Sequence, residues 1–580
     1  MVEERCVGLA KGPGEKPHQF TFISPDPDDV LPVGEYVYYL LSDESASRPV
    51  ICRIDERQEV RNYPDTFLAH PGVAPDELAR FLGYSEEDDE LFVLTASVLG
   101  YYDRGWGDFI NPRRLPRVGK PIFRAPADLL KSVLSRREPG SQGAAEIGSL
   151  LSRPPGEVPI VLDVSRFTST HLAIIAGTGS GKSYLAAVIV EEMMRPNNRS
   201  CVLILDPHGE YGSLQEMPNL AQFFAPRDGE LDEYRPKVKV LQPKDVKVAY
   251  RSLELDDIRY LLGKDVTAKM SWVLGQAFRA ARHRTRDNWT LDDLQRAVRE
   301  WADRVSSKPE NGGSTTEIDL NAQQTATALN WRLENALGKS ESAIFDDSRD
   351  MALAELFQPG QCTVLQLNQV PEREQQVVVA TILRRLYKAR VATVGGKAAP
   401  NDPAYLPYPA FVVIEEAHNF APASADLVTS EQLKRILSEG RKFGVGVCLI
   451  SQRPGRLDPD VLSQCMTQVL MRISNEVDQK RVAESVEAVG RSLLDELPGL
   501  SKGQAIVSGM GINTPVLVRV RQRFTRHEAQ DPDAPARWRE HFSQVNSAQR
   551  QREQALEHRE PPATTADLYR ELFGIDPDQE

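Results

Sequence analysis

Residues 176–183, which read AGTGSGKS, constrain the fold of this chain more than any other stretch. A short apolar run, residues 171–175, precedes them, and a segment with helical spacing, residues 184–194, follows them. The alternating glycines permit backbone conformations that a side chain would forbid. Backbone N–H groups can then point inward at a helix N-terminus, where an anion is stabilised. The order of strand, glycine-rich turn and helix is that of a phosphate-binding loop.

Lys182 and Ser183 give this loop its expected chemistry. The lysine would reach the β- and γ-phosphates of ATP, and the serine hydroxyl would hold Mg²⁺. We expect nucleotide contacts from the loop and the start of its helix: Gly177, Thr178, Gly179, Ser180, Gly181, Lys182, Ser183 and Tyr184. Ala176 stands where the usual pattern has its first glycine, and the alternative is a glycine-rich turn that binds nothing.

Composition restricts the class of protein further. With 580 residues, 41% of them hydrophobic, the chain can build more than one domain. A net charge of −13 argues against a protein that coats nucleic acid with an all-basic surface, but it is compatible with basic groups along one path. The six cysteines form no C-x-x-C pair, so we expect buried thiols. Neither a signal peptide nor an apolar run of the ~18 residues that a membrane helix needs is present, which predicts a cytoplasmic protein without a membrane partner.

The two ends of the chain differ from its middle. Residues 1–135 alternate short β-rich runs with turn residues, which predicts a small N-terminal β-barrel or sandwich. Residues 136–158 are rich in proline and glycine, and we expect a linker there. Residues 526–580 are rich in charge, glutamine and proline, which predicts a mobile or partner-dependent tail.

Acidic residues follow two buried strands of the predicted α/β core. The apolar run 411–414 ends in Glu415 and Glu416. Beside a phosphate loop, Glu415 can help to hold Mg²⁺, and Glu416 can act as the general base that polarises the attacking water. Two solvated acids at a strand end are the alternative. The run 201–205 ends in Asp206, which could contact the Mg²⁺ shell or could equally be a cap or turn former.

Two further polar positions complete the expected site. Gln452 follows the strand-like run 446–450, and we expect it to sense the γ-phosphate. Arg441 lies at a helix end and is a candidate arginine finger that reaches a neighbouring subunit's nucleotide. Alternatively, Arg441 is a cation that neutralises the helix C-terminus.

The core has two parts, residues 159–250 and 346–525. Residues 251–345 between them show helical spacing with few β-branched runs, which predicts an inserted helical bundle. Residues 516–523 alternate apolar positions with arginines, which predicts a half-exposed strand with a basic face.

Four motifs in this order resemble those of the HerA family, within the HerA/FtsK group of DNA-translocating ATPases. Besides the loop they are LDPHGEY at 205–211, IEEAH at 414–418, and EGRKFG at 439–444 followed by SQRP at 451–454. The resemblance covers roughly residues 160 to 520. It implies a HAS-like N-terminal barrel, which is a β-barrel like that of ATP synthase subunits. It also implies a RecA-like P-loop ATPase core with a helical insertion, and a C-terminal segment that braces the neighbouring subunit.

The same resemblance implies function. It predicts a homohexamer that threads double-stranded DNA through its pore, with Lys182 and Ser183 on the nucleotide, Glu416 as base and Arg441 acting across the subunit interface. It also implies a partner, either a NurA-type nuclease in DNA end processing or a sirtuin-like or other nuclease effector in antiphage defence. The competing hypothesis is a hexameric ATPase scaffold that assembles and regulates such an effector, with DNA movement secondary.

Overall fold

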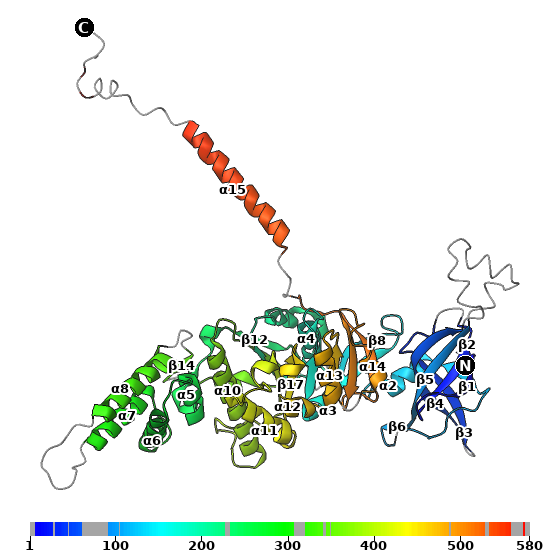
Figure 1. Ribbon diagram of the computed structural model, residues 1–580, viewed down its shortest axis with the longest axis horizontal. Helices are drawn as coiled ribbons and strands as arrows, with labels where there is room; N and C mark the ends of the chain where they lie inside the picture. Colours follow the sequence, from blue (N-terminus) through cyan, green and yellow to red (C-terminus); the bar gives the residue numbers. More distant parts are fainter. Residues whose placement is uncertain are drawn as a thin grey trace. The chain divides into compact units, whose positions relative to one another are not determined.

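The structure is a computed structural model that describes residues 6–26, 30–43, 46–60, 91–103, 105–226, 233–306, 320–339, 344–347, 350–486, 489–527 and 533–557, together with residues 572 and 574. The chain divides into two compact units, Met1–Arg526 and His527–Glu580 (Figure 1). The larger unit contains a β-barrel and a wide α/β sheet, and the smaller one contains a single long helix among its described residues.

The N-terminal strands close into a barrel. The order is β2-β1-β7-β3-β4-β5, and β5 pairs again with β2, so the described strands leave no open edge in this ring. Buried apolar side chains such as Phe20, Phe22 and Tyr39 fill its interior. The predicted small β-barrel is confirmed. Its strands are β1 (Cys6–Pro13), β2 (Gln19–Ser24), β3 (Tyr36–Asp43), β4 (Ala46–Val60), β5 (Leu91–Asp103) and β7 (Pro121–Arg124), and β6 (Asp108–Ile110) pairs with β5 outside the ring.

The α/β core is built on a sheet of eleven described strands in the order β12-β15-β11-β16-β17-β10-β18-β19-β20-β8-β9. From β12 to β18 the strands are parallel, and from β18 to β9 they are antiparallel. The carboxyl ends of the parallel strands therefore meet at one edge. The strands are β8 (Ala144–Leu150), β9 (Pro159–Asp163), β10 (Leu172–Ile175), β11 (Cys201–Asp206), β12 (Lys237–Leu241), β15 (Gln361–Gln366), β16 (Ala410–Ile414), β17 (Val445–Ser451), β18 (Thr467–Met471), β19 (Gln504–Gly509) and β20 (Val516–Val520).

Helices bury both faces of this sheet (Figure 1). Along β10, Leu172 and Ile174 belong to one apolar cluster, which includes residues of α2 and α4, whereas Ala173 and Ile175 belong to another, which includes residues of α10 and α11. Alternate side chains of a strand point to opposite faces, so the central strands β10, β11, β16 and β17 are buried along their whole length. These helices are α2 (Ala127–Leu134), α4 (Lys182–Met193), α10 (Glu372–Val394) and α11 (Val428–Phe443), and shorter ones are α3 (Val164–Thr170), α9 (Leu353–Leu356), α12 (Pro459–Ser463), α13 (Glu476–Ser485) and α14 (Arg491–Leu494).

Helices also occupy the middle of the chain, between two short strands that pair with each other, β13 (Val248–Ala249) and β14 (Phe345–Asp346). The helices are α5 (Leu255–Leu262), α6 (Ala268–Thr285), α7 (Leu291–Ser306) and α8 (Leu320–Leu333). Buried side chains such as Phe278, Trp289 and Leu294 join them to the core cluster under α10.

The sequence-based interpretation of residues 136–158 as a linker is wrong for part of that range. Residues 144–150 form β8, which pairs with both β20 and β9 and is buried along most of its length. Gly148 marks a close backbone approach, because a Cβ atom there would lie 2.0 Å from the carbonyl oxygen of Arg519. The proline and glycine residues around β8 are turns between strands.

The arginines that follow β20 do not form an exposed basic face. The side chains of Arg521 and Arg523 are 15% and 2% exposed. Arg521 forms ion pairs with Glu191 (3.0 Å) and Glu192 (2.8 Å) near the end of α4. Glu191 also accepts hydrogen bonds from the backbone N–H of Thr525 (2.9 Å) and from its hydroxyl. We call residues 521–525 the α4 clamp.

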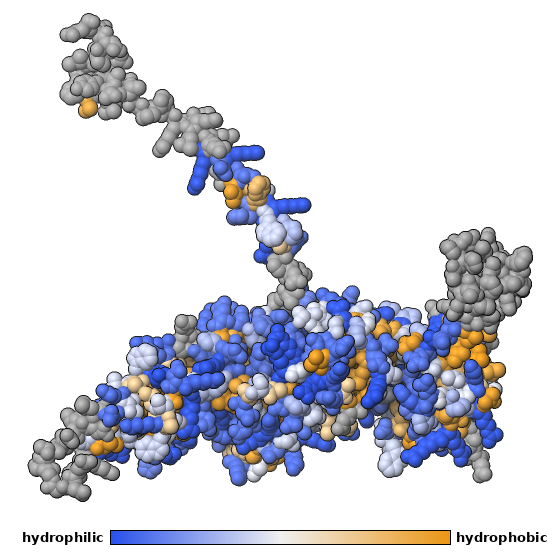
Figure 2. All heavy atoms as spheres, in the orientation of Figure 1, coloured by the Kyte–Doolittle hydropathy of each residue, from blue (hydrophilic) through white to orange (hydrophobic). Residues whose placement is uncertain are grey.

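The cysteines and the C-terminal region are the remaining features that the sequence analysis addressed. Of the six cysteines, all free, only Cys6 is exposed, as the scattered spacing predicted. None of the described helices combines the length and the apolar character that crossing a bilayer demands. In the smaller unit, α15 (Ala534–Glu557) carries the exposed side chains Trp538, Phe542 and Val545, and Figure 2 shows apolar atoms among its polar ones. The acidic end of the predicted tail lies outside the described residues.

Candidate nucleotide-binding site

The glycine-rich loop lies at the carboxyl edge of the sheet, between β10 and α4. Gly181, at φ 103°, begins α4 in a left-handed conformation that favours glycine. Gly177 donates its N–H to the carbonyl oxygen of Arg472 (2.8 Å), and a Cβ atom at this position would lie 2.9 Å from that oxygen. The loop is therefore held against the end of β18 by a contact that only glycine permits.

Lys182 contacts both acids that follow β16. Its ammonium group donates hydrogen bonds to Glu415 and, at 2.8 Å, to Glu416. Burial alone would lower the pKa of Lys182, but the charges of the two glutamates outweigh it, and the pKa is raised. Burial raises the pKa of Glu415, and the opposing charge of Lys182 limits that shift. The two acids do not lie free in solvent, because the side chains of Glu415 and Glu416 are 0% and 3% exposed.

Glu416 is held in an unusual geometry. Its backbone lies in the left-handed region (φ 51°, ψ 47°), which for a residue with a side chain is uncommon and costs about 1 kcal/mol or more. Its Oε2 atom is buried and accepts no hydrogen bond from the described residues, although His418 Nδ1 lies 3.3 Å away. His208 Nε2 is 3.8 Å from Oε1. A buried carboxylate oxygen without a donor marks a place for a water or another polar group.

Asp206 forms a turn. Its carboxylate accepts hydrogen bonds from four consecutive backbone N–H groups, those of His208, Gly209, Glu210 and Tyr211. Burial raises the pKa of Asp206, and these four donors oppose the rise. Both oxygens are occupied, so this geometry favours the turn-forming alternative over a direct metal ligand. The turn places Tyr211, whose hydroxyl donates to Glu415 at 2.7 Å.

Gln452 lies directly beside the loop. Thr178 Oγ1 donates a hydrogen bond to Gln452 Oε1 at 3.1 Å. The preceding residue, Ser451, lies 3.2 Å from His418 Nδ1 through its hydroxyl. The ends of β10, β16 and β17 thus bring together the loop, the two acids and the glutamine, as the sequence predicted.

These residues fit a magnesium nucleotide. The loop N–H groups at the start of α4 suit phosphate oxygens. Ser183, whose hydroxyl is near the helix start, and Glu415 are the candidate metal ligands, and two buried carboxylates beside one lysine leave a negative charge that a cation would balance. Asp206, whose carboxylate already accepts four N–H groups, is the weaker candidate for a direct metal ligand.

Arg441 is not part of this cluster. It is exposed in the last turn of α11, just before β17 begins at Val445. The loop follows Ile175, which pairs with Ser451 at the other end of β17. At about 3.3 Å per residue, a seven-residue strand separates the two places by about 20 Å. Arg441 cannot serve the site of its own chain.

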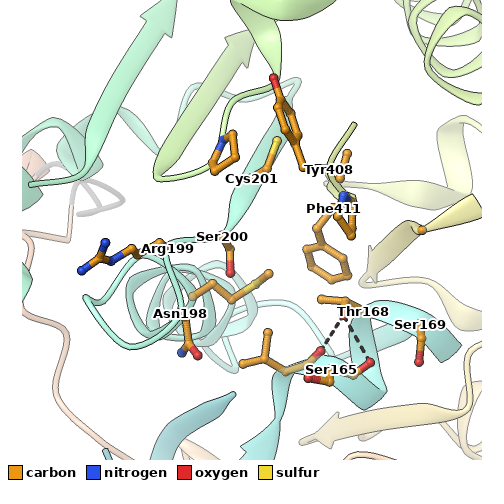
Figure 3. Close-up of a pocket in the computed structure, with 15 residues that line it drawn as sticks. Ser165, Thr168, Ser169, Asn198, Arg199, Ser200, Cys201, Tyr408 and Phe411 are labelled. Atoms are coloured by element: carbon orange, nitrogen blue, oxygen red, sulfur yellow. Dashed lines mark hydrogen bonds between the residues drawn. The ribbon is translucent and has the colours of Figure 1, made fainter. Parts of the chain in front are cut away.

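A pocket of about 420 Å³ opens at that same amino edge (Figure 3). It lies between α3, the start of β11 and the start of β16, and Gly444 of the α11–β17 turn also lines it. The hydroxyl of Thr168 there donates to carbonyl oxygens of its own helix. None of the residues that line this pocket is a predicted site residue, so the size of the pocket does not indicate the chemistry of the protein.

Comparison with known proteins places this geometry in a family. The profile of the family described as "Helicase HerA, central domain" matches residues 145–386. The DNA double-strand break repair helicase HerA of Pyrococcus furiosus is 30% identical over 475 residues, which are 77% of this chain and 79% of that protein. The chain belongs to the HerA helicase family. It is therefore an enzyme of the ATP-hydrolysing helicase class.

Other relatives of this HerA-family chain are at similar distances. The probable helicase MJECL08 of Methanocaldococcus jannaschii is 29% identical, over 77% of this chain and 83% of that protein. The HerA protein of Saccharolobus solfataricus is 28% identical over 74% and 78%. Among solved structures, VirB4 of Thermoanaerobacter pseudethanolicus has 12% identity and a TM-score of 0.44, over 66% of this chain and 97% of that chain, a likeness that bears on neither activity nor assembly.

Three side chains at the site were not predicted: Tyr211, His208 and His418. Each lies inside a motif that the sequence analysis quoted, LDPHGEY or IEEAH. The sequence signal for these residues was their position after a buried strand. The contacts of Tyr211 and His208 were not predictable, because they depend on the turn that the Asp206 carboxylate holds in the folded chain.

Proposed function

We propose that this chain is an ATP-driven translocase of double-stranded DNA that works as a homohexamer. The observation that carries the proposal is the cluster of Lys182, Glu415 and Glu416 beside a glycine-rich loop, in a chain of the HerA helicase family. The RecA-like description of the core, with residues 251–345 as its helical insertion, is part of the proposal. Two relatives are named DNA double-strand break repair helicases, which supports DNA end processing as the role of this chain, and a nuclease partner of NurA type is a further part of the proposal.

Lys182 changes partners in the proposed cycle. In this structure its ammonium group pairs with both Glu415 and Glu416. When ATP binds, Lys182 turns to the β- and γ-phosphates, and Glu416 is released to accept a proton from the attacking water. Gln452, which accepts a hydrogen bond from Thr178 at the end of β17, senses the γ-phosphate. Bound Mg²⁺, held by Ser183 and Glu415, would supply charge neutralisation for the phosphate oxygens.

Arg441 acts in trans in this proposal. Its place at the amino edge puts it about 20 Å from the loop of its own chain, so only the loop of a neighbouring subunit is left as a nucleotide site for it in the proposed ring. There it would stabilise charge on the transferred phosphoryl group, an effect worth ~10³–10⁵ in turnover.

The test is steady-state ATP hydrolysis by the purified chain, with and without linear double-stranded DNA, with the oligomeric mass measured on the same sample. We expect a hexamer whose turnover DNA stimulates. Glu416→Gln should retain ATP binding and the ring but lose at least 100-fold in turnover. The matched control is Glu431→Gln on α11, whose side chain is 77% exposed.

Two results would contradict the proposal. Turnover of Glu416→Gln close to that of Glu431→Gln would remove Glu416 as the base. A hexamer whose hydrolysis is indifferent to DNA would favour the scaffold that regulates a sirtuin-like or nuclease effector.

A further inference from the structure

Helix α6, in the middle of the chain, carries basic side chains and no acidic one. Its sequence from Ala268 to Thr285 contains no aspartate or glutamate, and its last turn is basic. The helix packs beside α7 and α8 (Figure 1). Because the whole chain has a net charge of −13, a helix with charges of one sign is a local exception. Such a surface indicates an anionic ligand.

The basic side chains of this helix end fall into two groups. Arg282 forms an ion pair with Asp287 at 2.6 Å, and Arg284 contacts Glu300 through both of its terminal nitrogens. Three other basic side chains are exposed and form no ion pair with the described residues: Arg279, His283 and Arg286. This second group has its hydrogen-bond donors open to a ligand.

The second group and Trp272 lie along one line of the helix, which we call the α6 line (Trp272, Arg279, His283 and Arg286). Residues seven apart in an α-helix lie almost on one face, about 10 Å from each other along the axis. Trp272, Arg279 and Arg286 have that spacing, with Arg286 just past the end of α6. Trp272 is 56% exposed, and its ring packs edge to face on Trp301 at 6.3 Å between centroids. An exposed indole therefore begins a line of unpaired basic side chains.

Helix α5 brings a further positive charge to the α6 line. A Cβ atom on Gly275 would lie 3.6 Å from Arg259 Nη2 and 4.0 Å from Arg279 Nη1. The two guanidinium groups therefore lie over the same glycine, although like charges repel. Arg259 also pairs with Asp256 at 3.0 Å, so Arg279 is the group that is left open. A negative ligand beside Arg279 would offset the repulsion.

The combination of unpaired basic groups with an exposed tryptophan indicates a single strand of nucleic acid. The phosphates of a strand form a regular row of negative charges, and arginine binds phosphate with two parallel N–H groups. An unpaired base can also stack on an exposed aromatic ring, whereas a base inside a duplex is already stacked. The carboxylates of an acidic protein segment would suit the arginines but would make no use of Trp272.

We propose that the α6 line binds a single strand of nucleic acid, with phosphates on its basic side chains and one base stacked on Trp272. Stacking of this kind accepts any base, so the contact should have little sequence preference. The inference goes beyond the proposed ATP-driven movement of duplex DNA, because it involves neither the nucleotide nor the catalytic cluster.

The experiment is the fluorescence anisotropy of a labelled oligothymidine of about 20 nucleotides, titrated with the full chain in the absence of ATP. A duplex of the same length is measured in parallel. Trp272→Ala should weaken oligothymidine binding at least fivefold, the effect of losing one stacked base, and it should weaken duplex binding less than twofold. The matched control is Trp331→Ala, because Trp331 is 66% exposed on α8 among neutral side chains.

The phosphate contacts have a separate signature in the salt dependence. Arg279→Gln should weaken oligothymidine binding and reduce the slope of log K against log salt concentration by about 0.7, because one phosphate contact is lost. Arg284→Gln is the matched control on the same helix, since Arg284 is already paired with Glu300, and it should leave the slope unchanged. Trp272→Ala should also leave the slope unchanged, because stacking releases no counterions.

Several results would overturn the proposal. Equal oligothymidine affinities of Trp272→Ala and Trp331→Ala would remove the stacked base, and equal losses of oligothymidine and duplex binding would remove the preference for a single strand. An unchanged slope in Arg279→Gln would remove the phosphate contact. A changed oligomeric mass of Trp272→Ala would assign the α6 line to a contact between copies of this chain. ATP hydrolysis without DNA should be the same in all four variants, so these outcomes are separable from a failure of the proposed function.

Discussion

His171, the residue before β10, should make the stability of the core fall as the pH falls. Its side chain is buried, and its Nδ1 atom accepts the backbone N–H of Val447 at 3.2 Å. Burial lowers the pKa of His171 from 6.5 to about 4. Below pH 6.5 the unfolded chain takes up a proton that the folded chain refuses, so stability is lost as the pH falls and the loss levels off below pH 4.

The magnitude follows from that shift. A difference of about 2.5 pKa units corresponds to a total of about 3 kcal/mol, because one unit is worth 1.36 kcal/mol. Between pH 7 and pH 5, roughly 2 kcal/mol of this should disappear, since the unfolded histidine is then almost fully charged and the folded one is largely neutral.

Asparagine is the informative substitution. Asn Oδ1 takes nearly the position of His Nδ1, so His171→Asn can keep the hydrogen bond to Val447 without titrating. The backbone at His171 (φ 62°, ψ 154°) lies in a region that is essentially restricted to glycine, so histidine already bears this strain and asparagine adds no new backbone cost. We therefore expect the variant to fold.

The assay is urea denaturation at pH 7, 6 and 5, followed by far-ultraviolet circular dichroism. Tryptophan fluorescence is unsuitable, because none of the six tryptophans lies in the central sheet. His171→Asn should lose about 2 kcal/mol less than the unaltered chain between pH 7 and 5, and the control His18→Asn, at an exposed position, should parallel the unaltered chain. Identical pH dependence in all three would refute the reasoning.

Three other predictions address the joints of the molecule. Arg153→Met should destabilise the barrel–core contact by about 3–5 kcal/mol in calorimetric unfolding, because Arg153 and Glu35 form a buried pair at 2.6 Å. The control Arg137→Met removes a half-exposed pair with Asp163 and should cost about 1 kcal/mol or less. Equal losses of stability in the two variants would contradict this account. Asp206→Asn has one acceptor oxygen for four N–H donors and should lose about 1–3 kcal/mol of stability in thermal denaturation, with the Mg²⁺ requirement of hydrolysis unchanged; a tenfold higher Mg²⁺ requirement in a stable variant would restore Asp206 as a metal ligand. Arg441→Ala should stop ATP turnover, and mixing it with Lys182→Ala subunits should recover part of it, whereas no recovery at any ratio would contradict a role across the interface.

The placement of the two acids and the glutamine beside the glycine-rich loop was predictable from the order of strand-like runs and polar residues along the chain. Glu415, Glu416 and Gln452 each follow an apolar run, and carboxyl ends of parallel strands share one edge with the loop. The role of Asp206 was not predictable, because a metal ligand and a turn former both require a carboxylate at a strand end. The four N–H partners that favour the turn former meet its carboxylate only in the folded chain.

The predictions for β8 and for Arg521 were wrong because both pair with residues that are distant in the sequence. β8 is short, and its partner β20 lies about 370 residues later, so the nearby prolines and glycines dominated the pattern. Arg521 was read as exposed because alternation identifies one face of a strand but not what covers it. Its partners Glu191 and Glu192 are 330 and 329 residues away on α4.

The α4 clamp sets where this chain can be shortened. Glu191 is fully buried, and the donors that satisfy its carboxylate all lie within residues 521–525, beyond the last strand of the sheet. A chain cut directly after β20 would keep every strand and still leave an unpaired charge inside the helix that begins at the glycine-rich loop, which is strongly unfavourable. A truncation that removes the smaller unit should therefore begin at His527 and not earlier. The larger unit depends on residues that lie beyond its last strand.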